Sequence, residues 1–191
     1  MNRTIRTATT LACIGLLGGI GAACGDDAGA SAPPTTVGHE HTSDDHDAMT
    51  VEIDGVDYRF EHVPESVPAG TRLSFTNRSA KELHELVAFR VDTDAPLDEL
   101  LATPPAELEA TLGAPVTVLL QPPGAPEPIV AVGDGTLTKP GRYVLLCFIP
   151  IGADPDEYMA AVAAAGGGKP EGVAGGPPHF TAGMVAELTV E

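Results

Sequence analysis

Basic residues are scarce in this sequence. Ten Lys and Arg stand against 27 Asp and Glu, which gives a formal net charge of −17 at pH 7. A chain of this sign repels phosphate backbones, so its charge argues against nucleic acid as a partner. It would instead attract a protein with a basic patch, and salt would weaken that attraction. Acidity that only keeps an exported protein soluble is the alternative interpretation.

The sequence also lacks the common catalytic motifs. It contains no GxSxG, no HExxH and no glycine-rich loop that would cradle a phosphate. No internal repeat of fixed period is visible, and the folded part needs no second domain. We therefore expect a single domain that is not an enzyme.

A long hydrophobic run is missing as well. The apolar stretch from Leu11 to Ala23 is too short to span a bilayer, and it follows a short basic start with Arg3 and Arg6. This layout is typical of a secretory signal. Its end, Ile20-Gly21-Ala22-Ala23-Cys24, resembles a bacterial lipobox, in which the cysteine becomes the lipidated first residue. Ordinary secretion with cleavage after Ala30-Ser31-Ala32 is the alternative, but the following proline should block it.

Residues 24–48 contain almost no large apolar side chain. Gly, Ala, Pro, Thr, Asp and His dominate, so the segment cannot bury enough surface to fold. We predict a flexible acidic tether between the signal peptide (1–23) and a domain at 49–191. His39, His41 and His46 on this tether form a candidate weak Cu(II) or Zn(II) site, against the simpler interpretation of a solvated linker.

Cysteine is nearly absent from the predicted mature domain. Cys13 would leave with the signal and Cys24 would carry lipid, so Cys147 would remain alone and could form no internal disulfide. An exposed thiol is a liability in an oxidising compartment. The lone cysteine therefore points to burial or to metal ligation.

Short strand patterns dominate the domain. Arg72–Asn77 alternates as a half-buried strand, and further strand patterns run over 83–91, 116–120, 129–132, 141–149 and 184–190, separated by Pro, Gly and Asn turn signals. Leucines at helical intervals predict short helices within 97–112. The sequence thus predicts an all-β sandwich with short helical insertions.

Candidate metal ligands lie at the ends of these strands. A copper electron-transfer site needs one thiolate, two imidazoles and a weak thioether, and the chain supplies Cys147, His84, His179 and Met184. Each residue has a structural alternative: a buried Cys, a core Met and satisfied His side chains.

The surrounding motifs resemble those of the cupredoxin family, the plastocyanin- and azurin-like blue copper proteins. Gly141-Arg142-Tyr143-Val144-Leu145-Leu146-Cys147 is similar to the family's penultimate strand. His179 to Val190 resembles the plastocyanin terminus, including four residues between His and Met. Val67 to Thr71, followed by Phe75-Thr76-Asn77 and His84, is similar to the strand before the first histidine.

This resemblance implies a Greek-key β-sandwich and one copper ion held by His84, Cys147, His179 and Met184. It implies one-electron transfer with protein redox partners, with the metal cycling between Cu(I) and Cu(II). Combined with the signal, it predicts a monomer outside the cytoplasmic membrane, anchored by lipid or else secreted. Copper storage or delivery and a metal-free binding or adhesion module are the alternatives.

One departure from the family pattern concerns the ligand loop. The family usually places the cysteine and second histidine a few residues apart, whereas 31 residues separate Cys147 from His179. We interpret 151–176 as an insertion that splits the loop, with a short helix at 156–165 and no regular structure over 166–176. The interpretation requires Pro150 and Pro177 to lie close together. Closing a longer loop costs only about 0.6 kcal/mol per doubling of length.

Overall fold

A computed structural model describes residues 49–166 and 168–191 of the chain. The predicted signal peptide, tether, Cys24, His39, His41 and His46 lie outside these residues, so they stay predictions. Within the described ranges, no helix combines the length and hydropathy that crossing a bilayer would require.

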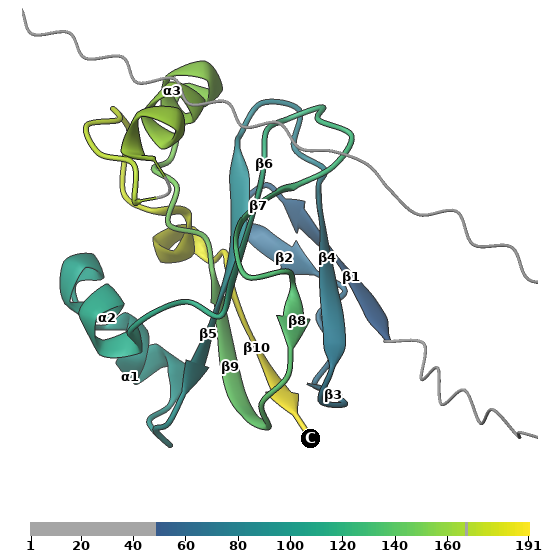
Figure 1. Ribbon diagram of the computed structural model, residues 1–191. Coiled ribbons are helices and arrows are strands. Elements are labelled where there is room, and N and C mark those ends of the chain that lie inside the picture. Colours follow the sequence, from purple (N-terminus) through teal and green to yellow (C-terminus); the bar gives the residue numbers. More distant parts are fainter. Residues whose placement is uncertain (1–48, 167) are drawn as a thin grey trace, which may run out of the picture. The chain divides into compact units, whose positions relative to one another are not determined.

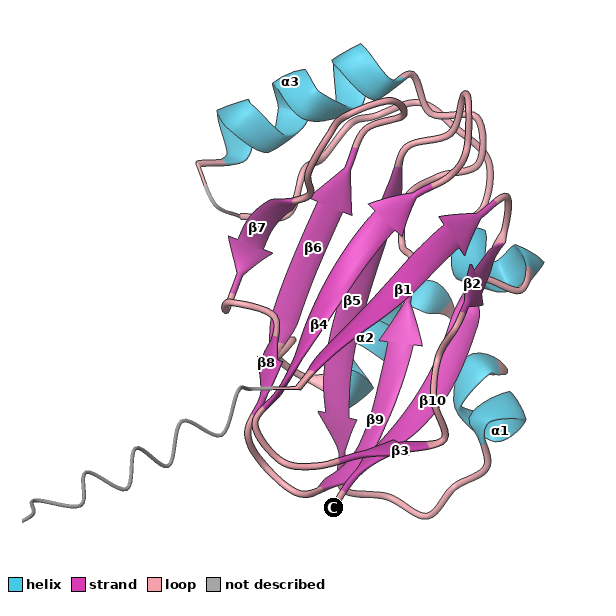
Figure 2. Cartoon of the chain, turned by 90° about the vertical axis from the view of Figure 1, so that its right-hand side faces the viewer, coloured by secondary structure: helices cyan, strands magenta, loops and turns pink. Residues whose placement is uncertain are grey.

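The described residues form two β-sheets, and in Figure 2 the sheet that contains β1 and β4 lies in front of the sheet that contains β5 and β9. The four-stranded sheet has the order β2-β1-β4-β8: β2 Arg59–Glu61, β1 Thr50–Val56, β4 Thr71–Asn77 and β8 Thr136–Leu137. The six-stranded sheet has the order β3-β10-β9-β5-β6-β7: β3 Ser66–Val67, β10 Val185–Val190, β9 Gly141–Leu146, β5 His84–Val91, β6 Thr117–Gln121 and β7 Ile129–Val132.

Four strands of the larger sheet form a Greek key. β5, β6 and β7 follow one another as antiparallel neighbours, and β9 returns after β8 to pair antiparallel with β5. The spatial order is thus fourth, first, second, third, which is the Greek-key arrangement. The predicted Greek-key β-sandwich with short helices is confirmed.

The core lies between the sheets because strand residues alternate between faces. Leu73 and Phe75 of β4 point inward and are buried. β9 is apolar on both faces: Tyr143 and Leu145 join the main core, whereas Val144 contributes to a second apolar cluster on the outer face. Burial on both faces explains the continuous apolar run that marks this strand in the sequence.

Three helices accompany the sheets, with α1 (Leu97–Leu101), α2 (Pro105–Leu112) and α3 (Pro155–Ala165) all on the outer side of the six-stranded sheet (Figure 1). The helices predicted within 97–112 and 156–165 are confirmed. Asp154 caps the N-terminus of α3, and its Oδ1 accepts hydrogen bonds from the N–H groups of Asp156 and Glu157 at 2.9 and 3.0 Å.

The sequence patterns missed three short elements. These are the two-residue strands β3 and β8 and a 3₁₀-helix, η1, at His179–Ala182. Two-residue strands carry too little alternation to be recognised. The predicted strand 141–149 ends earlier, at Leu146, because the next carbonyls accept hydrogen bonds from η1, including His179 N–H to Ile149 O at 2.9 Å.

Candidate metal centre

His84 is the first residue of β5, and a side-chain network fixes the turn before it. The Nδ2 of Asn77 donates to the carbonyls of Glu82 and Gln121, at 2.9 and 2.8 Å. The Oε1 of Gln121 accepts the N–H of Asn77 at 2.8 Å. His84 itself is fully buried. The network therefore holds the imidazole at a fixed place in the sandwich.

Cys147 follows β9 directly, and hydrogen bonds reach its N–H, its carbonyl and its sulfur. Its N–H donates to Met184 O at 3.3 Å, and its carbonyl accepts from Phe180 N–H at 2.9 Å. The N–H of Glu85 points at the sulfur, 3.4 Å from Sγ. A donor at this position stabilises a thiolate, and the thiolate is the form that binds metals.

The insertion returns to its starting point. Ile151 N–H donates to Pro177 O at 3.0 Å, and Pro150 forms an isolated β-bridge with Pro178. His179 is thus brought beside Cys147 despite the intervening residues. The prediction that the two halves of the ligand loop meet is confirmed.

The three ligand candidates converge in the interior. Ligating atoms of His84, Cys147 and His179 all lie within 4.8 Å of one another, and all three residues are buried. The two Nδ1 atoms of the histidines are 3.1 Å apart, and Cys147 Sγ is 3.4 Å from His179 Nδ1. The Nδ1 atoms and the sulfur therefore face one common point.

Met184 is tied to the same cluster through its backbone. Its N–H donates to His179 O at 3.2 Å, and its carbonyl accepts from Cys147. The side chain is fully buried in the core cluster that contains Cys147. It extends toward Gly55 of β1, where a Cβ would lie 3.1 Å from the Met184 methyl carbon. The predicted axial role of its sulfur remains a prediction.

Burial controls the protonation of the cluster. It lowers the pKa of His84 to about 4, with the neighbouring His179 contributing, and it lowers the pKa of His179. Burial also raises the pKa of the Cys147 thiol well above its ordinary value, and Glu85 adds to this. The imidazoles are therefore neutral and able to donate lone pairs. The thiol needs a cation before it releases its proton.

The outer nitrogens of the two rings, the Nε2 atoms, are buried and have no hydrogen-bond partner among the described residues. That of His179 lies 3.5 Å from Glu82 Oε2, too long for a good hydrogen bond but close enough for attraction between charges. An imidazole that binds metal through Nδ1 carries its proton on Nε2, and carboxylates commonly orient such rings. Glu82 lies where this partner is expected.

Two further residues frame the cluster. Tyr58 packs edge-on against the His179 ring, with centroids 5.0 Å apart. Glu85, on the other face of β5, is buried, and burial raises its pKa to about 7 although Phe148 N–H donates to its Oε1 at 3.1 Å.

Sequence reasoning missed Tyr58, Glu82 and Glu85. A signal existed only for Glu85, which interrupts the apolar strand after His84. His62, the third histidine of the described residues, is exposed and lies 3.4 Å from Asp54, away from the cluster's ligand set.

The donor set fits copper. One thiolate, two imidazoles and a thioether match the ligands of a blue-copper electron-transfer site, and thiolate and thioether together favour Cu(I) among the common metals. Structural zinc sites use four Cys or His ligands. The Nδ1 atoms that face the sulfur meet only each other and the thiol at 3.1 and 3.4 Å, and a metal ion between them would use their lone pairs better than these contacts do.

Comparisons with known proteins found similarity only among solved structures. No family model and no curated protein match the chain. A dithionite-reduced auracyanin from Roseiflexus castenholzii is 25% identical, with 75% of this chain and 98% of that chain covered and a TM-score of 0.43. Auracyanin A, a blue copper protein from Chloroflexus aurantiacus, is 19% identical, with 75% and 99% covered and a TM-score of 0.43. Auracyanin B is 21% identical, with 75% and 89% covered and a TM-score of 0.36.

Proposed function

We propose that this protein binds one copper ion through His84, Cys147, His179 and Met184 and transfers single electrons. The observation that carries the proposal is the buried convergence of one ring nitrogen of each histidine and Cys147 Sγ within 4.8 Å. A copper ion bound there would supply the redox chemistry by cycling between Cu(I) and Cu(II).

The chain's own contribution is a rigid, dry ligand set. β5, β9 and η1 hold the three donors, and hydrogen bonds of the backbone link Cys147 to Met184 and Phe180. Ligands held in this way move little when the charge of a bound ion changes. Little movement means a small reorganisation energy, which favours electron transfer over metal exchange.

Full burial argues against the alternative of copper storage or delivery. His84, Cys147, His179 and Met184 are each 0% exposed, so no ligand reaches the surface to hand a metal on. Voltammetry tests the choice: the copper-loaded protein should exchange one electron per molecule reversibly and keep its metal in the presence of a chelator. Rapid loss of copper to the chelator without a reversible wave would favour delivery.

An electron would reach the surface most directly beside His179. Tyr58 is half-buried there, and Glu82 lies against the outer nitrogen of the ring. We infer that a redox partner protein docks over these two side chains and presents a basic surface to this acidic chain.

We further propose that the protein works outside the cytoplasmic membrane, held there by lipid on Cys24. The apolar run ending in Ala22-Ala23-Cys24 supports this location. Cys24→Ser should release the protein from membranes or leave an uncleaved precursor. Mass spectrometry that finds an unmodified N-terminus at another site would contradict the anchor.

A further inference from the structure

A cavity of about 590 Å³ lies on the outer side of the six-stranded sheet. Residues of β5 and β6 form its floor, and residues of α2 and α3 flank it; both helices lie on this side of the sheet in Figure 1. Its volume falls within the range of pockets that enclose small organic molecules. The cavity is separate from the ligand cluster, because His84, Cys147 and His179 do not line it.

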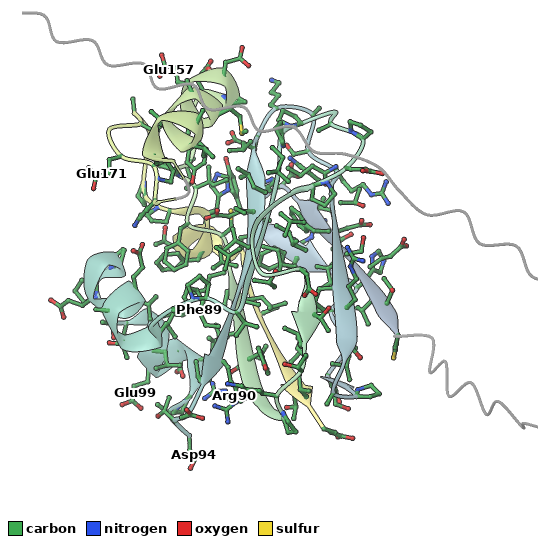
Figure 3. All side chains as sticks on the ribbon, viewed as in Figure 1. Phe89, Arg90, Asp94, Glu99, Glu157 and Glu171 are labelled. Atoms are coloured by element: carbon green, nitrogen blue, oxygen red, sulfur yellow. The ribbon has the colours of Figure 1, made fainter. Side chains whose placement is uncertain are left out.

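Three aromatic side chains line the cavity together with aliphatic residues. Alternation along β5 turns Phe89 to the outer face, where Figure 3 shows it on the side of α2. Its ring meets that of Phe148 edge-on, with centroids 5.9 Å apart, and Tyr158 of α3 also lines the cavity. Ring edges and faces of this kind select a flat, apolar ligand.

A buried carboxylate, that of Glu85, lies between β5 and the cavity. Glu85 lines the cavity although only 8% of the residue is exposed. Its Oε1 accepts the N–H of Phe148 at 3.1 Å, but no hydrogen bond reaches Oε2 from residues 49–166 or 168–191. Oε2 is not one of the buried side-chain atoms that lack a partner, so it is open to the cavity, where a donor can reach it. The fold thus leaves room beside Glu85 for a donor that the described residues do not provide.

Two oppositely charged side chains that form an ion pair also line the cavity. Lys169 and Glu109 both line it and form an ion pair with each other, and the Lys169 ammonium lies 5.9 Å from the Phe148 ring centroid. Because the pair cancels, the entrance does not require a charged ligand.

We propose that this cavity binds a small neutral aromatic molecule whose hydroxyl group donates a hydrogen bond to Glu85. The rings of Phe89, Phe148 and Tyr158 supply the apolar contacts, and the free oxygen of Glu85 fixes the orientation. The inference is independent of copper binding and is tested in the presence and absence of copper.

Calorimetry tests the proposal with 1-naphthol and with 1-methoxynaphthalene, which lacks the donor. One 1-naphthol should bind per protein, at least about tenfold more tightly than the methyl ether, since a hydrogen bond to a charged group contributes about 1.5–3 kcal/mol. Glu85→Gln should remove most of this preference. Glu107→Gln, an equal charge change at an exposed site outside the cavity, should keep it.

A second variant tests the proposal by reducing the volume of the cavity. Val162 of α3 lines the cavity and is only partly buried, so Val162→Phe should fold and fill the space. Both compounds should then bind at least about tenfold more weakly. No binding of 1-naphthol to the wild-type protein, equal affinity for the two compounds, or affinities that Val162→Phe leaves unchanged would overturn the proposal.

Discussion

A single residue, Gly55, leaves the space that the side chains of Phe75 and Met184 occupy. A Cβ at this position would lie 2.8 Å from Cζ of Phe75 and 3.1 Å from the Met184 methyl carbon. A glycine is needed here because two buried side chains fill the space that any larger residue would take.

Gly55→Ala should therefore overpack the core and displace Met184. We expect a loss of about 1–3 kcal/mol in the free energy of unfolding, measured by denaturant titration. The visible spectrum of the copper-loaded variant should also change, because the thioether moves. Gly176→Ala is the control, since its nearest neighbour would be at 3.4 Å, an ordinary contact. A stable Gly55→Ala protein with an unchanged spectrum would show that Met184 takes no part in the site.

Glu82 is a second single residue that should influence the copper site, through the charge of its carboxylate. Its carboxylate lies 3.5 Å from His179 Nε2 and should favour Cu(II) over Cu(I). Glu82→Gln should raise the reduction potential, by about 59 mV for each tenfold loss of Cu(II) affinity that Cu(I) does not share. Glu52→Gln, at an exposed position of β1, is the control. An unchanged or lower potential in Glu82→Gln would rule out this role.

Among the elements, the insertion at 151–176 contributes more to the core than its sequence indicates. The sequence predicts only an insertion that splits the ligand loop, yet Ala153 and Tyr158 are buried in the main core cluster. Gly152 N–H also donates to Glu82 Oε2 at 3.2 Å, and this carboxylate lies beside the His179 ring. The insertion therefore covers the ligand set and stabilises it.

Replacing residues 151–176 with a few Gly and Ser residues should keep the sandwich and its copper. The unfolding free energy should fall by about 1.5–3 kcal/mol for each large apolar side chain lost from the core. Copper exchange, followed with a chelator, should become faster because water reaches His179. Loss of both fold and copper would show that α3 is indispensable to the core and that the ends of the loop do not meet without it.

How far the sequence predicts the elements depends on their length and on local chemistry. The alternation over Arg72–Asn77 and the apolar run into Cys147 were sufficient to predict β4 and β9. The motifs around His84, Cys147 and His179 were sufficient to predict the cluster. β3 and β8 escaped because two residues carry no alternation, and η1 escaped because a single 3₁₀ turn has no apolar period. The positions of Glu82 and Tyr58 against His179 depend on contacts between distant segments, which no local pattern encodes.

At the scale of the whole molecule, charge should govern encounters. The net charge of −17 creates a field that attracts cations and repels anions. Electron exchange of the copper-loaded protein with a cationic ruthenium ammine complex should slow as salt is added, whereas exchange with ferricyanide should accelerate. Stopped-flow measurements over a range of ionic strengths provide the comparison. Rates that respond to salt equally for both reagents would mean that the acidic surface does not steer partners to the site.

The visible spectrum of the copper-loaded protein tests the central claim most directly. One copper per molecule should give a strong thiolate-to-copper absorption band near the red end of the visible range, because Cys147 Sγ lies with two imidazoles in one buried site. Cys147→Ser should abolish the band, since serine offers no sulfur. Copper binding well below one per molecule, or a spectrum that Cys147→Ser leaves unchanged, would contradict the account.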